Sequence, residues 1–258
     1  FYALLMLQGV FFVKQIRSEM ETDAPRTVSV VIPARNEESR IVSCVREALK
    51  DDAVTEVIVI DGGSSDRTRE KALGAGARVL EDRRSLEDGG GRGGQICTGI
   101  RAAQGDLVAV VHADTWVKAS DFTRMCKVLE KQPRLSGGAL GSVLKSRDSR
   151  LGLINFANDL RMVFSGISFG DQVQFFRRRS VVSRDLFPPI PLMEDVEFGI
   201  RLHGLGPQVF FFGSARVSPR RWETRGFRNA LSIMRRVASY LLRRIGGTPD
   251  TKAMYRSY

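Results

Sequence analysis

The chain has 258 residues, of which 43% are hydrophobic and 27% charged, and its formal net charge is +11. This composition excludes collagen-like, low-complexity and disordered chains, and the length suits one large domain or two small ones. The charge is uneven: residues 1–130 hold 18 basic and 20 acidic side chains, whereas residues 131–258 hold 22 and 9. Three cysteines without a CxxC pair and two histidines leave neither a disulfide framework nor a set of zinc ligands.

An apolar segment opens the chain. Thirteen almost unbroken apolar residues precede Lys14, fewer than the roughly 20 that a membrane-spanning helix needs. Two interpretations stay open for residues 1–26: the tail of a membrane anchor or targeting segment, or an amphipathic helix packed on the domain.

Strand-like and helical segments alternate from residue 28 onward. Near-continuous apolar runs, typical of strands buried on both faces, occupy 28–33, 56–61, 78–81 and 106–112. Helical patterns lie between them over 37–50, 66–73 and 94–103. The alternation predicts an α/β fold, with a mainly parallel sheet flanked by helices. The glycine-rich stretch 88–94 is expected to form a mobile loop.

The second half of the chain is less regular. Its predicted strands are 137–143, 172–177 and 210–212, and its predicted helices are 149–165, one that starts near Glu194, and 226–245. In the last helix apolar residues recur three and four apart, and arginines lie mostly off that line. This basic amphipathic helix either packs on the domain or lies on an anionic membrane surface, and both interpretations stay open.

Four polar motifs follow predicted strands, at the edge where ligands bind to open α/β sheets. They are PARNEE at 33–38, DGGSSDRT at 61–68, GRGGQ at 91–95 and HADT at 112–115. Each also has a structural interpretation, since Asp61 and Asp66 suit turns and helix caps and a glycine cluster alone is weak evidence. Their combination favours a ligand site. A dinucleotide fold would need GxGxxG in the first strand-to-helix turn, and that turn, PARNEE, has no glycine, so such a fold is disfavoured. The P-loop pattern GxxxxGK[ST] is absent.

Together with PLMEDVEF at 191–198, these motifs resemble the family 2 glycosyltransferases of GT-A fold, in the same order over residues 27–225. They are similar to a bacterial-type subgroup with GRGxQ, LHADT and PLMEDVE motifs, some of whose members act in arsenosugar biosynthesis. The resemblance implies an enzyme that moves a sugar from a nucleotide-diphosphate sugar to an acceptor hydroxyl or phosphate. It divides the chain into an N-terminal segment 1–26, a GT-A domain 27–225 with a nucleotide-binding half 27–130 and an acceptor half 131–225, and a basic helix and tail 226–258.

The resemblance also implies roles for donor-side residues. The nucleoside pocket would be lined by Pro33, Ala34, Glu37 and Asp61, and the diphosphate would lie near Arg92 and Gln95. Asp114 would hold Mn²⁺ or Mg²⁺ between the phosphates. His112 departs from the family's Asp-x-Asp motif, and it is interpreted as a second ligand suited to Mn²⁺, a hydrogen-bonding residue behind the ligands, or a core histidine.

On the acceptor side, Glu194 and Asp195 resemble the family's catalytic ED motif, in which the Asp is the general base of an inverting transfer. Acids also favour the first turn of a helix, and Glu197 is expected to be structural. Asp171, in the GDQ motif, faces a substrate sugar or forms a turn. Arg221 and Trp222 resemble the end of a QxxRW motif, with Ser at position 218 instead of Gln.

The implied partners are a nucleotide-sugar donor, an acceptor that is a small molecule or lipid-linked, and an anionic membrane surface. A membrane-associated or peripheral cytoplasmic-face location would follow. No nucleic acid is expected, because the basic half has no recognisable binding motif. The first rival hypothesis is a non-catalytic GT-A-like module that binds nucleotides or membranes. The second, ranked below it, is a nucleotidyltransferase.

Overall fold

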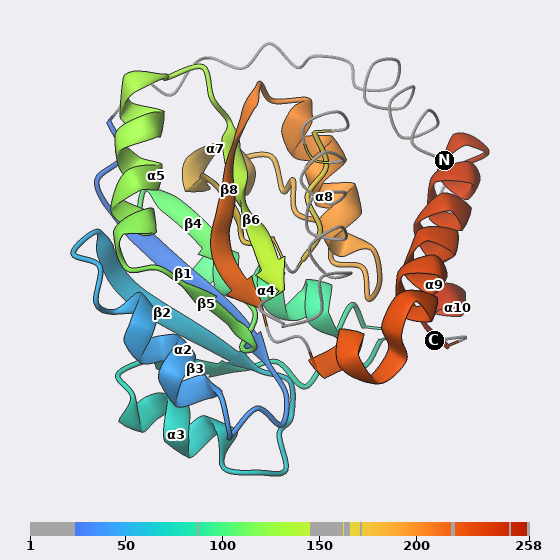
Figure 1. Ribbon diagram of the computed structural model, residues 1–258, viewed down its shortest axis with the longest axis horizontal. Coiled ribbons are helices and arrows are strands. Elements are labelled where there is room, and N and C mark those ends of the chain that lie inside the picture. The colour runs from blue at the N-terminus through green and yellow to red at the C-terminus, as the bar shows by residue number, and fades with distance from the viewer. Residues whose placement is uncertain are drawn as a thin grey trace.

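The computed structural model describes residues 24–86, 88–144, 162, 166–170, 172–217, 220–247 and 249–256, without the side chains of 144, 220–231 and 256. These residues form one eight-stranded sheet with helices on both faces (Figure 1). The strands are β1 (Val28–Ala34), β2 (Val54–Asp61), β3 (Arg78–Glu81), β4 (Leu107–Val110), β5 (Thr115–Val117), β6 (Gly137–Leu144), β7 (Gln174–Arg177) and β8 (Gln208–Val217). The helices are α2 (Ile41–Ala48), α3 (Thr68–Gly74), α4 (Arg92–Ala102), α5 (Ser120–Lys131), α7 (Arg178–Val182), α8 (Glu194–His203), α9 (Arg220–Ile245) and α10 (Thr251–Arg256).

The sheet has a parallel part and a mixed part, in the order β3-β2-β1-β4-β7-β6-β8-β5. The neighbours from β3 to β4 are all parallel. Beyond β4, the pairs β4–β7 and β7–β6 are antiparallel, the pair β6–β8 is parallel, and the pair β8–β5 is antiparallel. The predicted α/β fold is therefore confirmed, and its parallel part comes from the run of buried strands in the first half.

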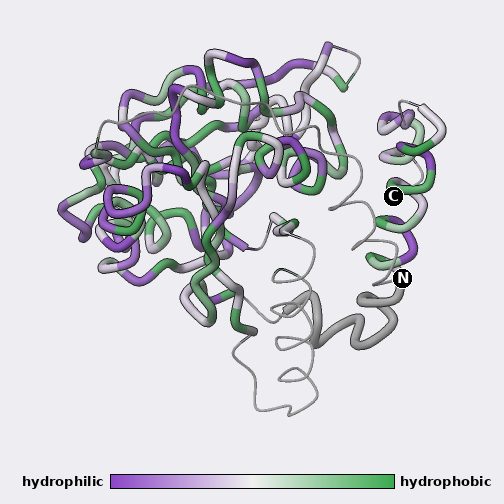
Figure 2. Tube along the Cα trace, turned by 90° about the horizontal axis from the view of Figure 1, so that it is seen from above, coloured by the Kyte–Doolittle hydropathy of each residue, from purple (hydrophilic) through white to green (hydrophobic). Residues whose placement is uncertain are grey.

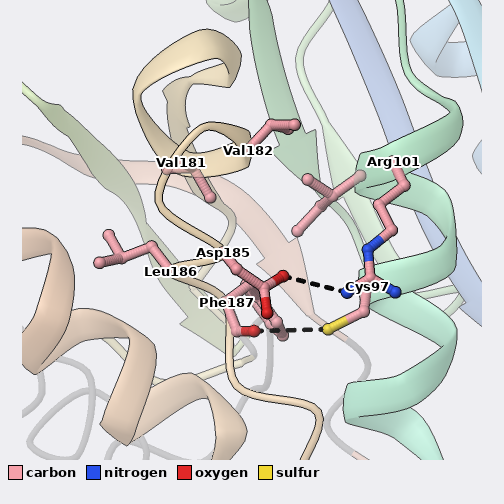
Figure 3. A pocket seen from close by; sticks show the side chains of 8 residues that line it. Cys97, Arg101, Val181, Val182, Asp185, Leu186 and Phe187 are labelled. Carbon is pink, nitrogen blue, oxygen red and sulfur yellow. Dashed lines mark hydrogen bonds and ion pairs between the residues drawn. The ribbon is translucent and has the colours of Figure 1, made fainter.

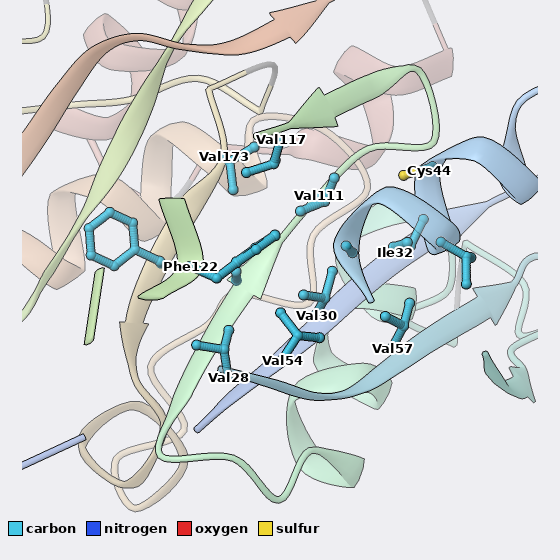
Figure 4. Close-up of a cluster of buried hydrophobic side chains, with 14 of the residues drawn as sticks. Val28, Val30, Ile32, Cys44, Val54, Val57, Val111, Val117, Phe122 and Val173 are labelled. Carbon is cyan, nitrogen blue, oxygen red and sulfur yellow. The ribbon is translucent and has the colours of Figure 1, made fainter. Parts of the chain in front are cut away.

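Both faces of the parallel strands are buried, as their unbroken apolar runs predict. On one face, β1, β2 and β4 pack against α2, α3 and α5 in the cluster shown in Figure 4. On the other face, alternate residues of the same strands pack against α4, α7 and α8. Gly99 lets α4 approach closely, because a Cβ there would lie 2.4 Å from Cγ1 of Val31 on β1.

Several predicted boundaries are wrong. The helix expected from residue 94 already begins at Arg92, so the loop predicted over 88–94 is shorter. The strand predicted over 210–212 extends from Gln208 to Val217. The sequence patterns did not predict β5, α5, α7 or α10, and the helix predicted over 149–165 lies almost wholly outside the described residues.

The long helix α9 lies on the flank of the molecule where α8 lies (Figure 1), and hydrophobic and hydrophilic residues alternate along its coloured part (Figure 2). Its buried residues Val237, Tyr240 and Leu241 form a third core cluster with α8. Of the two interpretations of the amphipathic stripe, this part of α9 supports packing on the domain. Within the described ranges, no helix is both long and apolar enough to cross a bilayer.

Candidate active site

The loops that follow β1 and β2 are tied together by hydrogen bonds. Asn36, at a left-handed φ of 57°, receives a hydrogen bond from Ser65 N to its Oδ1 (2.9 Å) and donates its own N–H to Ser64 Oγ (3.0 Å). The N–H of Glu37 donates to Thr68 Oγ1 at 2.8 Å. The PARNEE and DGGSSDRT motifs therefore form one interlocked structure at the carboxyl ends of adjacent strands.

Asp61 ends β2 directly beside Ala34, the last residue of β1. Its carboxylate is fully buried and accepts hydrogen bonds from the N–H groups of Gly63 and Ser64, each 3.1 Å from Oδ2. In the structure this side chain therefore holds its own turn, the role that Asp residues commonly take there.

The first turn of α4 reaches these loops. Gln95 is buried, and a Cβ added to Gly62 would lie 1.8 Å from its Nε2, so the Gln95 amide packs directly on Gly62. Pro33 and Ala34 are buried beside the same turn, whereas Glu37 is half-buried and forms an ion pair with Arg40 at 2.9 Å. The structure thus brings most of the predicted donor-side residues to one edge of the sheet.

The HADT motif forms a tight turn between β4 and β5. Thr115 N donates to the carbonyl oxygen of His112 at 2.9 Å. The Cys44 thiol of α2 lies beneath this turn, with its Sγ 3.6 Å from the His112 carbonyl and 3.5 Å from the Thr115 carbonyl. Burial, followed by the charges of Asp114 and Glu37, raises the pKa of Cys44 to about 12, so the thiol is neutral.

Asp195 and His112 face one another across Gly170. Gly170 N donates to Oδ2 of Asp195 at 2.5 Å. An ideal Cβ on Gly170 would lie 3.1 Å from Asp195 Oδ2 and 3.1 Å from His112 Nε2, so both side chains border the same point in space. Oδ1 of Asp195 accepts the N–H of Val196 at 2.9 Å, which fixes the carboxylate at the start of α8. Asp195 is half-buried, which leaves it accessible from solvent.

Glu194, the neighbour of Asp195, is almost completely buried and pairs with Arg92 of α4. Burial, the largest influence, raises the pKa of Glu194; the positive charge of Arg92 opposes this effect, and the negative charge of Asp195 adds to it. Because the Glu194 side chain is only 1% exposed, it does not face solvent as Asp195 does. The ion pair links the beginnings of α4 and α8.

The predicted metal ligands His112 and Asp114 lie in the turn between β4 and β5. Within the described ranges, no group of three or more His, Cys, Asp or Glu side chains is placed to hold an ion. No hydrogen bond or ion pair in those ranges engages the Asp114 carboxylate, which is half-buried at the sheet edge. A single protein carboxylate of this kind fits a cation that takes most of its other ligands from substrate phosphates, as Mg²⁺ commonly does.

One group of structural residues was not predicted. Arg84 donates to the Asp82 carboxylate from Nε (2.8 Å) and Nη2 (2.6 Å) and to the Gly94 carbonyl from Nη2 (3.1 Å). Asp82 also accepts from Thr98 at 3.0 Å. These contacts hold the loop before α4 against the helix. Arg84 lies in a charge-dense stretch without a motif, so no sequence pattern indicates this role.

Three predicted residues remain untested. Asp171 lies outside the described residues, and of Arg221 and Trp222 only the backbone, at the start of α9, is described.

A pocket lies elsewhere, between α4 and the chain at α7 and just after it (Figure 3), and has a volume of about 40 Å³. That space suits a few water molecules and is too small for a nucleotide sugar.

A comparison with protein families identifies the family of the chain. The model of glycosyl transferase family 2 matches residues 29–186, more than half of the chain. The chain belongs to glycosyl transferase family 2. This confirms the family and enzyme class that the motifs predicted, and the matched range includes all four donor-side motifs.

Curated members related to this family 2 chain match only part of it. A glucosyl-3-phosphoglycerate synthase of Mycobacterium tuberculosis is 38% identical over 96 residues, 35% of this chain and 30% of that protein. The human dolichyl-phosphate beta-glucosyltransferase is 34% identical over 120 residues, 42% of this chain and 37% of that protein. The match thus spans about a third of each curated relative's length.

A solved structure resembles the family 2 chain over most of its length. It is glucosyl-3-phosphoglycerate synthase from Mycobacterium tuberculosis in complex with Mn²⁺, uridine diphosphate and glucosyl-3-phosphoglycerate. The TM-score is 0.57 at 25% identity, and the match covers 90% of this chain and 84% of the other. The likeness extends the agreement in fold beyond the segment that the curated relatives share.

Proposed function

We propose that this family 2 member transfers a sugar from a nucleotide-diphosphate sugar to a hydroxyl or phosphate of an acceptor, with inversion at the anomeric carbon and with a divalent cation. The observation that carries the proposal is the placement of Asp195, a solvent-accessible carboxylate fixed by Gly170 opposite His112. The similarity to a structure that holds uridine diphosphate and Mn²⁺ supports a uridine-type donor and a metal.

In the proposed reaction Asp195 acts as general base. One of its oxygens accepts the proton of the acceptor hydroxyl while the acceptor oxygen attacks the anomeric carbon and the bond from that carbon to the diphosphate breaks. The contacts with Gly170 and Val196 fix the carboxylate, and an ionised carboxylate has further lone pairs with which to take the proton. Glu194 contributes by holding Arg92, whose side chain is 38% exposed.

On the donor side, we assign the nucleoside to the interlocked loops, with Pro33, Ala34 and Glu37 as its lining and Asp61 as the residue that shapes the turn. Gln95 supports that turn from α4. Asp114 and His112 would hold Mn²⁺ or Mg²⁺, which when bound neutralises charge on the departing diphosphate. The positive charge of Arg92 would act in the same sense.

On the acceptor side, Asp171, Arg221 and Trp222 are proposed to contact the acceptor or the donor sugar. The acceptor panel therefore includes phosphorylated small molecules, such as 3-phosphoglycerate, and polyprenyl phosphates in detergent. Membership of the subgroup with arsenosugar members is a further hypothesis, tested by adding pentavalent organoarsenic alcohols to the panel.

The proposal is tested by nucleoside-diphosphate release from a panel of nucleotide sugars with Mn²⁺, with and without acceptors. Asp195→Asn is expected to lower kcat by about 10²- to 10⁴-fold, the range typical of a lost general base. Asp114→Asn is expected to raise the Mn²⁺ concentration needed for half-maximal rate. Asp52→Asn, which removes an exposed carboxylate remote from the motifs, is the matched control.

Three results would count against the proposal. Unchanged rates in Asp195→Asn and Asp114→Asn would remove the assigned roles. A product that retains the anomeric configuration of the donor, measured by proton NMR, would exclude the inverting mechanism. Binding of nucleotide sugars without turnover on any acceptor would favour the non-catalytic module.

A further inference from the structure

Helix α9 contacts α8 at a buried carboxylate, Glu197, which lies two residues after Asp195. Glu197 of α8 accepts hydrogen bonds from Tyr240 Oη (2.8 Å) and Arg244 Nε (2.7 Å), both on α9. Its other oxygen accepts from Arg201 Nε at 3.0 Å, within α8. Glu197 is 7% exposed, so these three donors satisfy a carboxylate that water barely reaches.

The negative charge of Glu197 stabilises the contact between α8 and α9. Burial alone would raise its pKa, but the hydrogen bonds from Arg244, Tyr240 and Arg201 outweigh burial and hold the pKa of Glu197 below its ordinary value. The group is therefore ionised at neutral pH. Removing a donor of α9 while Glu197 stays buried would leave its charge with fewer partners, which is strongly unfavourable.

The residue before the Glu194-Asp195 pair depends on the same helix. Met193 has a left-handed φ of 62°, a conformation that is unfavourable for a residue with a side chain and persists only where its surroundings enforce it. Its side chain is 8% exposed and packs in a cluster that includes Val237, Tyr240 and Leu241 of α9. The backbone turn that aims Asp195 is thus covered by α9.

The second support of Asp195 belongs to this cluster as well. Ile167 is buried in it and Phe169 packs against it, and the next residue, Gly170, donates its N–H to Asp195 Oδ2. Helix α9 therefore packs against both chain segments that fix the Asp195 carboxylate, although none of its described side chains hydrogen-bonds to Asp195 itself.

We propose that α9 positions the catalytic base, with Tyr240 and Arg244 as positioning residues that act through Glu197. The inference rests on the proposed function of Asp195. It gives the C-terminal helix a role in turnover: it holds the start of α8 and the 167–170 segment in the geometry that proton transfer needs. The tolerance of such geometry is small, because displacements of about 1 Å can lower rates by 10²-fold.

The test compares two adjacent arginines of α9. Arg244→Gln removes a Glu197 contact, whereas Arg243→Gln makes the same change of charge at an exposed side chain. We expect Arg244→Gln and Tyr240→Phe to lower kcat about 10-fold, with the donor KM within twofold of the wild type. Arg244→Lys, which keeps a charged donor, is expected to recover part of kcat, and Arg243→Gln is expected to match the wild type.

Amide hydrogen exchange provides a readout that does not depend on turnover. The N–H groups of Gly170 and Val196 both donate to Asp195. Their peptides are expected to exchange faster in Arg244→Gln and Tyr240→Phe than in Arg243→Gln, because loss of the contact between α8 and α9 frees both segments.

The outcomes separate this inference from the proposed function. A loss of thermal stability with unchanged kcat and unchanged exchange at Gly170 and Val196 would make Glu197, Tyr240 and Arg244 merely structural and would overturn the inference. A wild-type protein that turns over no nucleotide sugar would defeat the proposed function. In that case, unchanged amide exchange at Gly170 and Val196 in Arg244→Gln and Tyr240→Phe would still refute the inference that α9 holds the segments that fix Asp195.

Discussion

Replacing Gly170 by alanine would place a methyl group between His112 and Asp195. An ideal Cβ there lies 3.0 Å from His112 Cε1 and 3.1 Å from Asp195 Oδ2, whereas carbon atoms normally pack at about 3.5–4.0 Å. The imidazole and the carboxylate must therefore retreat by about half an ångström, the limit within which catalytic groups are usefully held. Since φ at Gly170 lies outside the left-handed region and alanine keeps the N–H that binds Asp195, the backbone itself tolerates the change.

We expect Gly170→Ala to lower kcat about 10-fold and to lower the free energy of unfolding by about 1 kcal/mol, the lower end of the range for an added methyl in a packed site. The assay is nucleoside-diphosphate release at saturating donor, with urea unfolding followed by circular dichroism in parallel. Gly74→Ala, at the end of α3, is the control, because no described atom beyond its chain neighbours and the adjacent backbone of α3 lies within 4 Å of the added methyl. A Gly170→Ala enzyme with kcat within twofold of the wild type would refute the role of this contact.

Three further predictions concern stability and reactivity. Gly93→Ala would bring a Cβ to 2.2 Å from the carbonyl oxygen of Ile190, so we expect it to lower the free energy of unfolding by about 1–3 kcal/mol or more, measured by urea denaturation. Hydrogen bonds outweigh burial and lower the folded-state pKa of Glu197. The stability that this carboxylate contributes is therefore present above its ordinary pKa of about 4.5 and is lost as the pH falls through the lowered value. Glu197→Gln should accordingly flatten the acid side of the curve of unfolding free energy against pH. Burial raises the pKa of Cys44 and Cys126 to about 12, so a thiol reagent at pH 8 should label both cysteines only after unfolding, as measured by mass spectrometry.

The parallel part of the fold was predictable because its strands are uniform. Residues of β1 are buried throughout, so the apolar run marks the strand without interruption. In β8, by contrast, the exposed Phe212 and a glycine with positive φ at 213 interrupt the apolar pattern, and the prediction stopped at 212. The pairing of β6 with β8 shifts register between Leu140 and Ser142, a local irregularity that no periodicity reveals.

The candidate site was predictable where its residues follow strands, and not where contacts join distant segments. Asp61 and Asp114 are marked by their positions after apolar runs. The ion pair of Arg92 and Glu194 spans 102 residues, and nothing local to either residue indicates the other. Tyr240 lies in the last predicted helix, where no local pattern indicates that its ring is buried and that its hydroxyl donates to Glu197.

The sheet order has a consequence for engineering the enzyme. β4, from the predicted nucleotide-binding half, pairs with β1 on one side and with β7, from the predicted acceptor half, on the other. The two halves therefore contribute paired strands to one sheet and side chains to the same core clusters, so we do not expect the acceptor half to be exchangeable between family members as an independent module. To change the acceptor preference, individual loops should instead be grafted, with the pairing of every strand from β1 to β8 left unchanged.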